Sequence, residues 1–374
     1  MTTLKDYRLV FVGPALGKTA VGDYAEDFVN GVRPYFGEVA EVRTDGPGEV
    51  SVGDLRRTRR EVAAEVAKGQ RGRVLVHVEL SAGALAPFWS TSNLTGVPVT
   101  ATVHDPPQGV WLPARTRFIT RSRVLTHGIH LPLRSVTRAF EGRVYRDRTL
   151  FALTETGRRS IERIYPATHT VYIPHLVRER PTVRPAEERP RAIGFFGHVY
   201  RGKGFEQIVR IRELLPDGIA IRVAGRGTED LPEIDGVDVL GPVDGPSEDA
   251  FFESVRAIVV PYGKRHWAAA SFAASGVVAH SMAYRTPVVS TDWAALAELD
   301  EHVGAAVVPV RGLDAEGVAA ALAETIGAVV DDESRLAELG RCAEKARVDR
   351  STASTAAAFA ATWSELLALG DGRD

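Results

Sequence analysis

The stretch that decides the fold is GFFGHVYRGKGFEQIVRI, residues 194–211. It opens as a short apolar run, passes through a glycine turn, and then takes up helical spacing in FEQIVRI. The turn carries Arg201 and Lys203, each followed by a glycine, directly before the helix. A strand that enters a helix through such a turn is a typical unit of a parallel α/β sheet, because parallel strands need long, usually helical crossovers.

The same alternation extends outward from this stretch in both directions. The apolar runs that predict strands are RLVFV (8–12), RVLVHVEL (73–80), VPVTATVHD (97–105), LFALTE (150–155), TVYIPH (170–175), RAIGFFGHV (191–199), IAIRVAGR (219–226), VDVLGPV (237–243), AIVVPY (257–262), TPVVST (286–291) and GAAVVPV (304–310). Helix-like stretches with apolar residues three to four positions apart separate them. Near-continuous apolar strands with helices between them indicate parallel sheets that are covered on both faces.

A proline-rich segment without periodicity divides this alternation into two halves. Residues 177–190 predict a linker. We therefore expect an α/β protein with two Rossmann-like, doubly wound domains, at residues 1–176 and 191–350, that face each other across a cleft. Ligands of doubly wound sheets bind beyond the carboxyl ends of the strands, so the cleft is the expected site. The alanine-rich residues 351–374 predict a C-terminal helix that packs back on the N-terminal domain.

The composition is that of a soluble globular protein long enough for two full-sized domains. The 374 residues are 44% hydrophobic and 25% charged, and the formal net charge of −2 gives no general attraction to nucleic acid. The single cysteine, Cys342, excludes an internal disulfide and a cysteine-based zinc site. No apolar run approaches the ~20 residues of a membrane span and the first residues lack an export segment, so we expect a cytoplasmic protein.

A second glycine turn, GPALGKT at residues 13–19, follows the first strand and resembles a phosphate-binding P-loop. A P-loop needs four residues between its glycines, whereas only three lie between Gly13 and Gly17. The shorter loop cannot surround a β-phosphate with the same ring of N–H groups, so we reject that interpretation. Gly17 and Gly22 either favour an anion at the helix start or simply form a tight strand-to-helix turn.

Several further segments occur in a recognisable order and spacing. They are TVHD (102–105), TETGRRSIERIYP (154–166), VYIPH (171–175), VAGRG (223–227), VLGPV (239–243), VVPY (259–262) and SGVVAHSMAYRTPVVSTD (275–292). Together with the turn at residues 201–204 they cover nearly the whole chain, which resembles the retaining GT-B glycosyltransferases of the large "group one" family. The resemblance implies an enzyme without metal or cofactor that binds a nucleotide-sugar and transfers the sugar with retention of configuration.

The resemblance also implies roles for particular residues. Lys203, with Arg201 beside it, would neutralise the leaving diphosphate; a solvated lysine at a helix start is the alternative. His104 would lie near the reacting face of the sugar, and a histidine satisfied by packing is the alternative. The leaving phosphate would itself deprotonate the acceptor, so no side-chain nucleophile is expected. The residues expected to contact the donor are Gly17, Gly22, Gly197, His198, Leu240, Ser275, Gly276, Val277, His280 and Glu298.

The sequence departs from the family pattern at this donor site. His198 stands where the family has an arginine, and Phe272 and His280 stand where it has two glutamates. A histidine can still hydrogen-bond a ribose hydroxyl, whereas phenylalanine cannot replace a carboxylate. We expect the turn at Ser275 and Gly276, at a helix N-terminus, to hold phosphate through backbone N–H groups.

We therefore predict a glycosyltransferase that passes a sugar to a glycan or lipid-linked acceptor in cell-surface polysaccharide or glycoconjugate synthesis. The lost glutamates suggest a catalytically inactive GT-B binding protein as the alternative, and a nucleotide-sugar epimerase is another. Residues 111–148 hold nine arginines against Glu141 and Asp147, with apolar residues interleaved. Such a segment predicts peripheral contact with an anionic membrane, or else arginines on a solvated helix face. We expect no metal site, because the histidines are scattered and no DxD triplet occurs.

Overall fold

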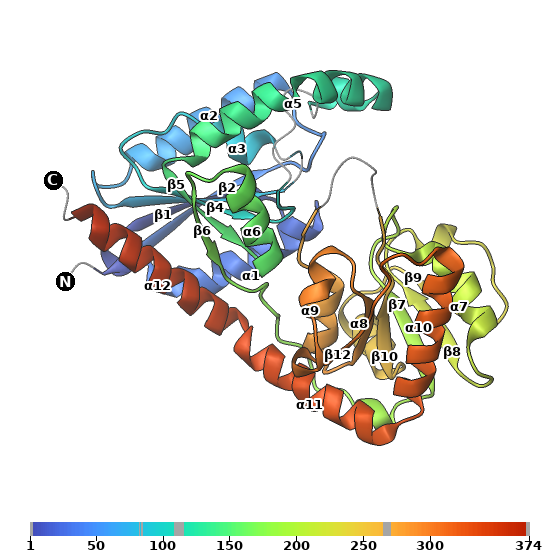
Figure 1. Ribbon diagram of the computed structural model, residues 1–374. Helices are drawn as coiled ribbons and strands as arrows, with labels where there is room; N and C mark the ends of the chain where they lie inside the picture. Colours follow the sequence, from blue (N-terminus) through green and yellow to red (C-terminus); the bar gives the residue numbers. More distant parts are fainter. Residues whose placement is uncertain (1–2, 82, 84, 108–115, 265–270, 372–374) are drawn as a thin grey trace. The chain divides into compact units, whose positions relative to one another are not determined.

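The computed structural model describes residues 3–81, 83, 85–107, 116–264 and 271–371. The chain forms two compact units, each built on its own six-stranded sheet (Figure 1). The first unit contains Met1–Leu176, Ser271–Ala274 and Thr352–Asp374, and the second contains Val177–Ala270 and Ser275–Ser351. The prediction of an α/β protein with two doubly wound sheets is confirmed.

The sheet of the first unit has parallel strands in the order β2-β1-β3-β4-β5-β6. These strands are β1 (Arg8–Pro14), β2 (Glu38–Thr44), β3 (Val74–Leu80), β4 (Val99–Val103), β5 (Arg148–Ala152) and β6 (His169–Tyr172). The central strands β1, β3, β4 and β5 are buried along their whole length, in keeping with their apolar runs. The strand order changes direction between β1 and β3, and such a switch point is where doubly wound sheets place ligands.

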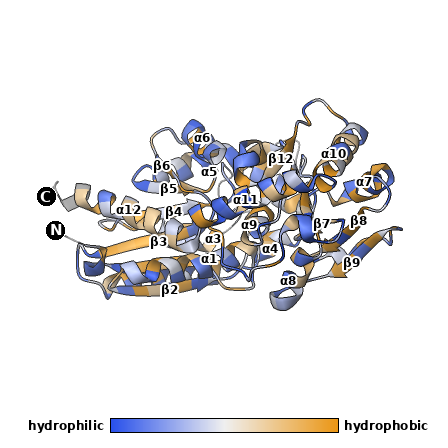
Figure 2. Cartoon of the chain, turned by 90° about the horizontal axis from the view of Figure 1, so that it is seen from below, coloured by the Kyte–Doolittle hydropathy of each residue, from blue (hydrophilic) through white to orange (hydrophobic). Residues whose placement is uncertain are grey.

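The helices of the first unit cover both faces of this sheet. They are α1 (Ala20–Val32), α2 (Val52–Ala67), α3 (Leu85–Thr91), α4 (Arg117–Thr120), α5 (Arg123–Tyr145), α6 (Glu155–Ile164) and α12 (Thr352–Asp371), with 3-10 turns at Leu4–Asp6 and Arg33–Tyr35. Hydrophobic residues dominate β3, whereas hydrophilic residues dominate α6 (Figure 2). Helix α6 buries only Gly157, Ser160 and Ile161, so it meets the sheet along one narrow face.

The C-terminal helix α12 is part of the first unit and packs on α1. The Phe359 ring lies 4.7 Å from the ring of Phe28 and 4.3 Å from that of Phe151, centroid to centroid. Trp363 is fully buried beside them and donates its indole N–H to Thr100 Oγ1 at 3.2 Å. Helix α12 thus completes the aromatic core of a unit whose other helices and strands all end before Val177.

The sheet of the second unit has the order β12-β11-β10-β7-β8-β9. Its strands are β7 (Ala192–Phe196), β8 (Ala220–Ala224), β9 (Val237–Gly241), β10 (Ala257–Val260), β11 (Val288–Thr291) and β12 (Ala305–Val308), all paired in parallel. Counted from β7, this is the Rossmann order, whose switch point lies between the first and fourth strands. All six strands lie within apolar runs from which strands were predicted.

The helices of the second unit complete its doubly wound arrangement. They are α7 (Ile208–Leu214), α8 (Gly245–Glu253), α9 (Gly276–Ala283), α10 (Ala315–Val330) and α11 (Glu333–Asp349), with 3-10 turns η3 (Ala186–Glu188), η4 (Phe205–Gln207), η5 (Thr228–Asp230), η6 (Ala294–Glu298) and η7 (Glu301–Val303). Helix α9 is apolar and largely buried, with six of its eight residues in the core. A helix this buried holds its N-terminus in a fixed place against the sheet.

The proline-rich residues 177–190 belong to the second unit rather than forming a free linker. Val183 and Ala186 are buried in its core, and Arg189 is only 2% exposed. The Arg189 guanidinium donates to the carbonyl oxygens of Phe252 and Tyr284 at 3.1 and 3.0 Å. Burial lowers the pKa of Arg189 to about 10, and these carbonyls satisfy the charge. The absence of periodicity was therefore a poor sign of a linker, because an extended segment can also be packed.

Candidate active site

The basic turn after β7 is fixed by backbone contacts that require glycine. Gly202 and Gly204 have φ of 90° and 78°, in the left-handed region. A Cβ atom on Gly204 would lie 2.0 Å from the carbonyl oxygen of Pro261, so no other residue fits there. Gly263 N–H donates to the Gly202 carbonyl at 3.1 Å. The turn that carries Lys203 is thus held against the segment that follows β10.

The Lys203 ammonium lies between two tyrosines. Its Nζ donates to the hydroxyl of Tyr262 and lies 3.8 Å from the centroid of that ring. The Tyr200 ring centroid is 5.3 Å from the same nitrogen. Arg201 is exposed, and within the described residues it has no hydrogen bond or ion pair; His198, beside it in the loop, is half-buried. The site therefore offers one cation on an aromatic support and a second on the surface.

The N-terminus of α9 lies at the same place. The Ser275 hydroxyl accepts from Val278 N–H at 3.4 Å as the N-cap, and its Oγ is 3.1 Å from the Tyr262 hydroxyl oxygen. The backbone N–H groups of Gly276 and Val277 belong to the first turn and have no partner within the helix. The structure thus brings together four predicted residues, Lys203, Ser275, Gly276 and Val277, in a pattern suited to an anion.

Two more glycines let neighbouring segments approach one another closely at the carboxyl-end edge of the second sheet. Gly197, at the end of β7, has φ of 113°, and a Cβ there would lie 3.0 Å from Val277 Cγ2. A Cβ on Gly225, after β8, would lie 2.0 Å from the Gly197 carbonyl oxygen. The ends of β7 and β8 therefore pack tightly beside α9, at the switch point between β7 and β10, where a Rossmann sheet binds phosphate.

His280 lies in α9 and is oriented by a buried carboxylate. Its Nδ1 is 2.8 Å from Oε1 of Glu248, which is 4% exposed and also binds Arg180 Nη2 at 3.0 and 3.1 Å. Burial raises the pKa of Glu248, but His280 and Arg180 outweigh it and leave the pKa below its ordinary value. An ionised carboxylate only accepts, so His280 donates Nδ1–H and its Nε2 is left to meet a ligand.

The remaining donor-site residues of the second unit lie at the ends of other elements. Leu240 is exposed on the edge strand β9, where it is the extra residue of a bulge opposite Val223 and Ala224. Glu298 ends η6 and is exposed. This turn begins at Ala294, whose φ of 55° is left-handed, so the chain makes a glycine-type turn there without glycine. The donor roles of Leu240 and Glu298 stay predictions.

Phe272, which stands where the family has a glutamate, is part of the first unit. Its backbone N–H donates to the Pro106 carbonyl at 2.7 Å, and its own carbonyl accepts from Thr154 Oγ1 at 2.7 Å. The short segment Ser271–Ala274 is therefore attached to the first unit through its main chain, and this attachment does not depend on the side chain of Phe272.

In the first unit, His104 is held by a glutamate that the sequence analysis did not single out. His104 Nε2 lies 2.6 Å from Oε2 of Glu79, whose side chain is fully buried at the end of β3. Burial raises the pKa of Glu79, but the hydrogen bond from His104 and the nearby His77, whose Nε2 is 3.4 Å from Oε1, outweigh burial and lower the pKa to about 2. Gly13 gives the Glu79 side chain its space, because a Cβ atom on residue 13 would lie 3.3 Å from Glu79 Cγ. The pair lies by the switch point between β1 and β3.

The glycine turn of residues 13–19 has local partners. Gly17, with φ of 73°, donates its N–H to the Asp23 carboxylate at 3.0 Å. Gly22 lies in the first turn of α1, capped by Thr19, and a Cβ there would be 2.2 Å from the Ala15 carbonyl oxygen. The Asp23 carboxylate thus occupies the position at this turn that a bound anion would take. This favours the alternative that the glycines simply form a tight strand-to-helix turn. Contact of Gly17 or Gly22 with the donor stays a prediction.

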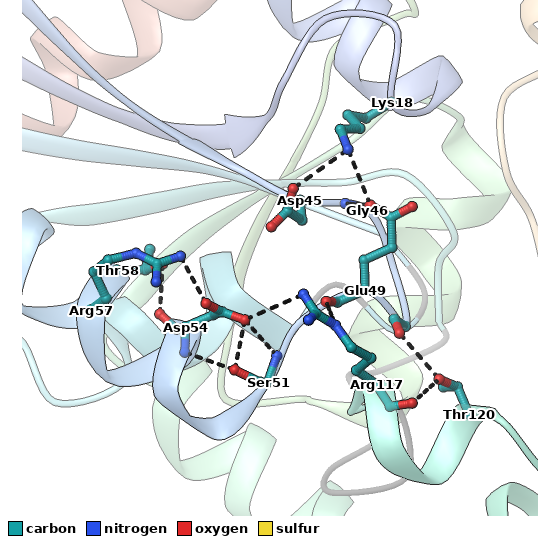
Figure 3. A network of polar contacts seen from close by, with 11 residues as sticks. Lys18, Asp45, Gly46, Glu49, Ser51, Asp54, Arg57, Thr58, Arg117 and Thr120 are labelled. Atoms are coloured by element: carbon teal, nitrogen blue, oxygen red, sulfur yellow. Dashed lines mark hydrogen bonds and ion pairs between the residues drawn. The ribbon is translucent and has the colours of Figure 1, made fainter.

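Figure 3 shows that two basic residues near this turn are already paired. Lys18 Nζ lies 3.6 Å from carboxylate oxygens of both Asp45 and Glu49. Arg117 donates through Nε to the Glu49 carbonyl at 2.6 Å and lies 3.6 Å from Asp54. Lys18 thus forms ion pairs within the first unit. Arg117 is likewise paired, so it is not a free cation of the basic segment, residues 111–148.

The rest of that segment, residues 111–148, divides into buried and exposed parts. Trp111, Leu112 and Arg115 lie outside the described residues. Arg148 is buried on β5, where it donates to Thr91, and burial lowers its pKa to about 10. The large exposed apolar side chains of α4 and α5 are Phe118, Val124, Leu125, Leu131, Leu133, Val136 and Phe140. No helix in the described part of the chain is long and apolar enough to cross a membrane.

Comparisons with known proteins agree with this architecture. Residues 190–330 match the family model for group 1 glycosyl transferases. The fold is similar to Anabaena Alr3699/HepE in complex with UDP and glucose, with a TM-score of 0.64, 13% identity, and coverage of 96% of this chain and 100% of that one. No curated protein sequence matches.

Two further structures have the same fold. A structure from E. coli, described as trehalose-6-phosphate bound with UDP-2-fluoro glucose, has a TM-score of 0.63 at 12% identity, over 95% of this chain and 98% of that one. WaaG, a glycosyltransferase involved in lipopolysaccharide biosynthesis, has a TM-score of 0.56 at 12% identity, over 94% of this chain and 98% of that one. The predicted GT-B fold is confirmed, and the resemblance to group 1 glycosyl transferases is confirmed over residues 190–330. A glycosyltransferase is the class of protein that this fold and the family match over residues 190–330 support.

Proposed function

We propose that this protein transfers a sugar from a nucleotide-sugar to a glycan or lipid-linked acceptor, with retention of configuration and without a metal. The observation that carries the proposal is the joint position of Lys203 and the N-terminus of α9, linked through Tyr262 at the switch point of the second sheet. A nucleoside diphosphate leaves with growing negative charge, and this site supplies both a cation and free backbone N–H groups to meet it.

The donor site is completed by residues that surround this anion site. His280, oriented by Glu248, offers Nε2 to a ribose hydroxyl in place of the glutamate that the family uses there. Arg201 offers a positive charge in place of the arginine that the family has at the position of His198. Among the described residues, no group of three or more His, Cys, Asp or Glu side chains is arranged to hold a metal ion. In the proposed reaction, Lys203, Arg201 and the N-terminus of α9 would meet the charge on the leaving group.

The donor test uses the whole protein and a panel of radiolabelled nucleotide-sugars, beginning with UDP-sugars because the structures of HepE contain UDP. We expect slow release of free sugar from one donor even without an acceptor. Lack of both hydrolysis and binding with every donor would contradict the proposal, whereas binding of a donor without its hydrolysis or transfer would favour a catalytically inactive binding protein. Interconversion of the sugar without its release would indicate an epimerase.

The stereochemical test follows the anomeric carbon of the product by NMR at early times. We expect the configuration of the donor, because in the proposed course the leaving phosphate takes the acceptor's proton on the same face. An inverted product would contradict retention. It would then point to His104, with Glu79 behind it, as a general base on the opposite face.

We further propose that the acceptor is reached at an anionic membrane surface through α4 and α5, in cell-surface polysaccharide or glycoconjugate synthesis on the cytoplasmic side. Phe118, Val124 and Val136 are 76%, 81% and 66% exposed, and exposed apolar side chains of this number on one segment mark an interaction surface. Arg121 is exposed beside them, and Arg134 and Arg138 follow along α5. Apolar residues with arginines among them suit the boundary of an anionic bilayer.

Vesicle co-sedimentation tests this part. We expect binding to anionic vesicles that weakens with salt, and that falls when Phe118, Val124 and Val136 are replaced together by serine. Val348→Ser is the control, because Val348 is an exposed apolar residue of the second unit, on α11. Equal recovery in the supernatant with anionic and neutral vesicles at low salt would contradict the membrane proposal and indicate a soluble acceptor.

A further inference from the structure

Tyr262 connects three parts of the second unit at the anion site. It lies two residues after the end of β10, and its carbonyl oxygen accepts from Thr291 Oγ1, at the end of β11, at 2.7 Å. Its hydroxyl accepts from Lys203 Nζ in the turn after β7 and lies 3.1 Å from Ser275 Oγ, the N-cap of α9. The residue is thus anchored by its main chain while its side chain joins the cation to the helix.

The direction of these hydrogen bonds follows from the ammonium. Lys203 can only donate, so the Tyr262 oxygen accepts from it and the Tyr262 O–H is left to donate to Ser275. Burial raises the pKa of the Tyr262 phenol above its ordinary value, so the hydroxyl keeps the proton that it donates to Ser275. Ser275 Oγ then accepts from both Tyr262 and Val278 N–H, and its own proton is directed to another acceptor.

We propose that Tyr262 is a positioning residue that holds the Lys203 ammonium at the N-terminus of α9, so that the cation, the Ser275 O–H and the free N–H groups of Gly276 and Val277 meet the same diphosphate. The inference rests on the proposed function, because it assigns the anion of that site. The ring supports the ammonium at 3.8 Å from its centroid, and the hydroxyl fixes the direction of approach. Fixing the cation in advance reduces the cost of ordering a flexible lysine when the ligand binds.

The test separates the hydroxyl from the ring. Tyr262→Phe keeps the aromatic support and removes the hydrogen bonds, and binding of inorganic diphosphate and of UDP is measured by calorimetry, with uridine as the uncharged comparison. We expect about tenfold weaker binding of both phosphate ligands, the size of one lost hydrogen bond to a charged group, with uridine unaffected. In kinetics the same variant should raise KM for the donor, because the diphosphate is already bound in the ground state. It should also lower kcat, because the negative charge on the leaving diphosphate grows in the transition state.

A double-mutant cycle with Lys203→Ala shows whether Tyr262 acts through the lysine. Without the ammonium to hold, Tyr262→Phe should cause little further loss, so the two effects should be far from additive. Tyr284→Phe is the matched control: it removes a tyrosine hydroxyl, bonded to Asp249 at 2.6 Å, just after the opposite end of α9. Ser275→Ala interrupts the same chain from the other side and should weaken diphosphate binding in the same direction.

The outcomes distinguish this inference from the proposed function. Unchanged diphosphate affinity in Tyr262→Phe, or additive losses in the cycle, would overturn the positioning role alone. If the wild-type protein bound neither inorganic diphosphate nor any nucleoside diphosphate, both the inference and the proposed function would fall. If Tyr262→Phe does not fold, Tyr262→Leu with its own Lys203→Ala cycle tests the same role, because it removes both the ring and the hydroxyl from the ammonium.

Discussion

At the scale of single residues, this protein fixes its candidate site groups with supporting side chains. Lys203 is held by a tyrosine ring and hydroxyl, His280 by Glu248, and His104 by Glu79. In each case a group that can meet a ligand is fixed by a partner that lies deeper in the unit. Such support limits the number of orientations that the functional group can adopt, which is how a protein prepares a site before the ligand arrives.

The first prediction concerns Lys203. Lys203→Ala should leave the fold intact and lower turnover by roughly 10²-fold or more, the scale of losing one preorganised charge stabiliser. Arg201→Ala should have the same effect but a smaller one, because Arg201 is exposed and screened by water. Turnover with the preferred donor is the measurement, and thermal unfolding of both variants controls for folding. Wild-type turnover in Lys203→Ala would remove the assigned anion site.

The second prediction concerns Glu79, whose folded-state pKa of about 2 lies below its ordinary value of 4.5. A depressed carboxyl pKa stabilises the folded state fully above about pH 4.5, and that contribution is lost as the pH falls toward 2. Glu79→Gln should therefore lower the free energy of unfolding at neutral pH, by at most about 3 kcal/mol. The difference from wild type should shrink as the pH falls through this window.

Urea unfolding at several pH values between 7 and 3 measures this difference. Glu365→Gln is the control, because Glu365 is exposed on α12 and its replacement should matter little at any pH. A difference between Glu79→Gln and wild type that does not change with pH would show that the ionised carboxylate is not what stabilises the site.

At the scale of elements, α12 is the clearest case of a helix whose role is decided by what it buries. Its alanine-rich sequence favours a helix by propensity alone, yet a helix of this kind is held in a protein mainly by packing. Phe359 and Trp363 on its inner face enter the core of the first unit, between α1 and the sheet. The first unit is therefore incomplete without the last residues of the chain.

Trp363→Ala is the third prediction. Removing a fully buried tryptophan leaves a large cavity and removes one hydrogen bond to Thr100 Oγ1, so we expect the free energy of unfolding to fall by roughly 3–5 kcal/mol. Glu365→Ala, two positions along the same helix but exposed, should change it by less than about 0.5 kcal/mol. Equal stability of the two variants, measured by urea unfolding, would mean that α12 does not close this core.

At the scale of the whole molecule, the net charge of −2 is small, so attraction to an anionic donor depends on local groups. The fourth prediction is that this attraction needs no metal ion. In excess EDTA, the preferred nucleoside diphosphate should still raise the melting temperature. At about one hundred times its Kd the gain is about 2.7 kcal/mol, or roughly 5 °C or more for a unit of this size.

A thermal-shift screen of UDP, GDP, TDP and ADP, with and without EDTA, makes the measurement. Uridine and the other nucleosides serve as controls for contacts that involve no phosphate. A shift that EDTA abolishes and magnesium or manganese restores would contradict a metal-independent site.

The sequence by itself determined the class of fold, all six strands of the second unit, the turn that carries Lys203 and the capped start of α9. These features are local: apolar runs, glycine at left-handed positions and a serine before a helix act within a few residues of chain. The edge strand β2 was not among the predicted strands, because polar residues interrupt its apolar ones without a regular alternation and only Val42 and Thr44 are buried. Residues 177–190 were misjudged because their burial depends on partners far along the chain.

Only the tertiary structure decided which residues support the site. Tyr262 meets Lys203 across 59 residues and Glu79 meets His104 across 25, and both pairs form because parallel strands bring their carboxyl ends to one edge of a sheet. The same long-range contacts placed Arg148 in the core and paired Arg117 with Asp54, so the count of arginines in the basic segment overstated its free charge. These contacts depend on the strand order, which no short stretch of sequence encodes, and for that physical reason the sequence alone did not predict them.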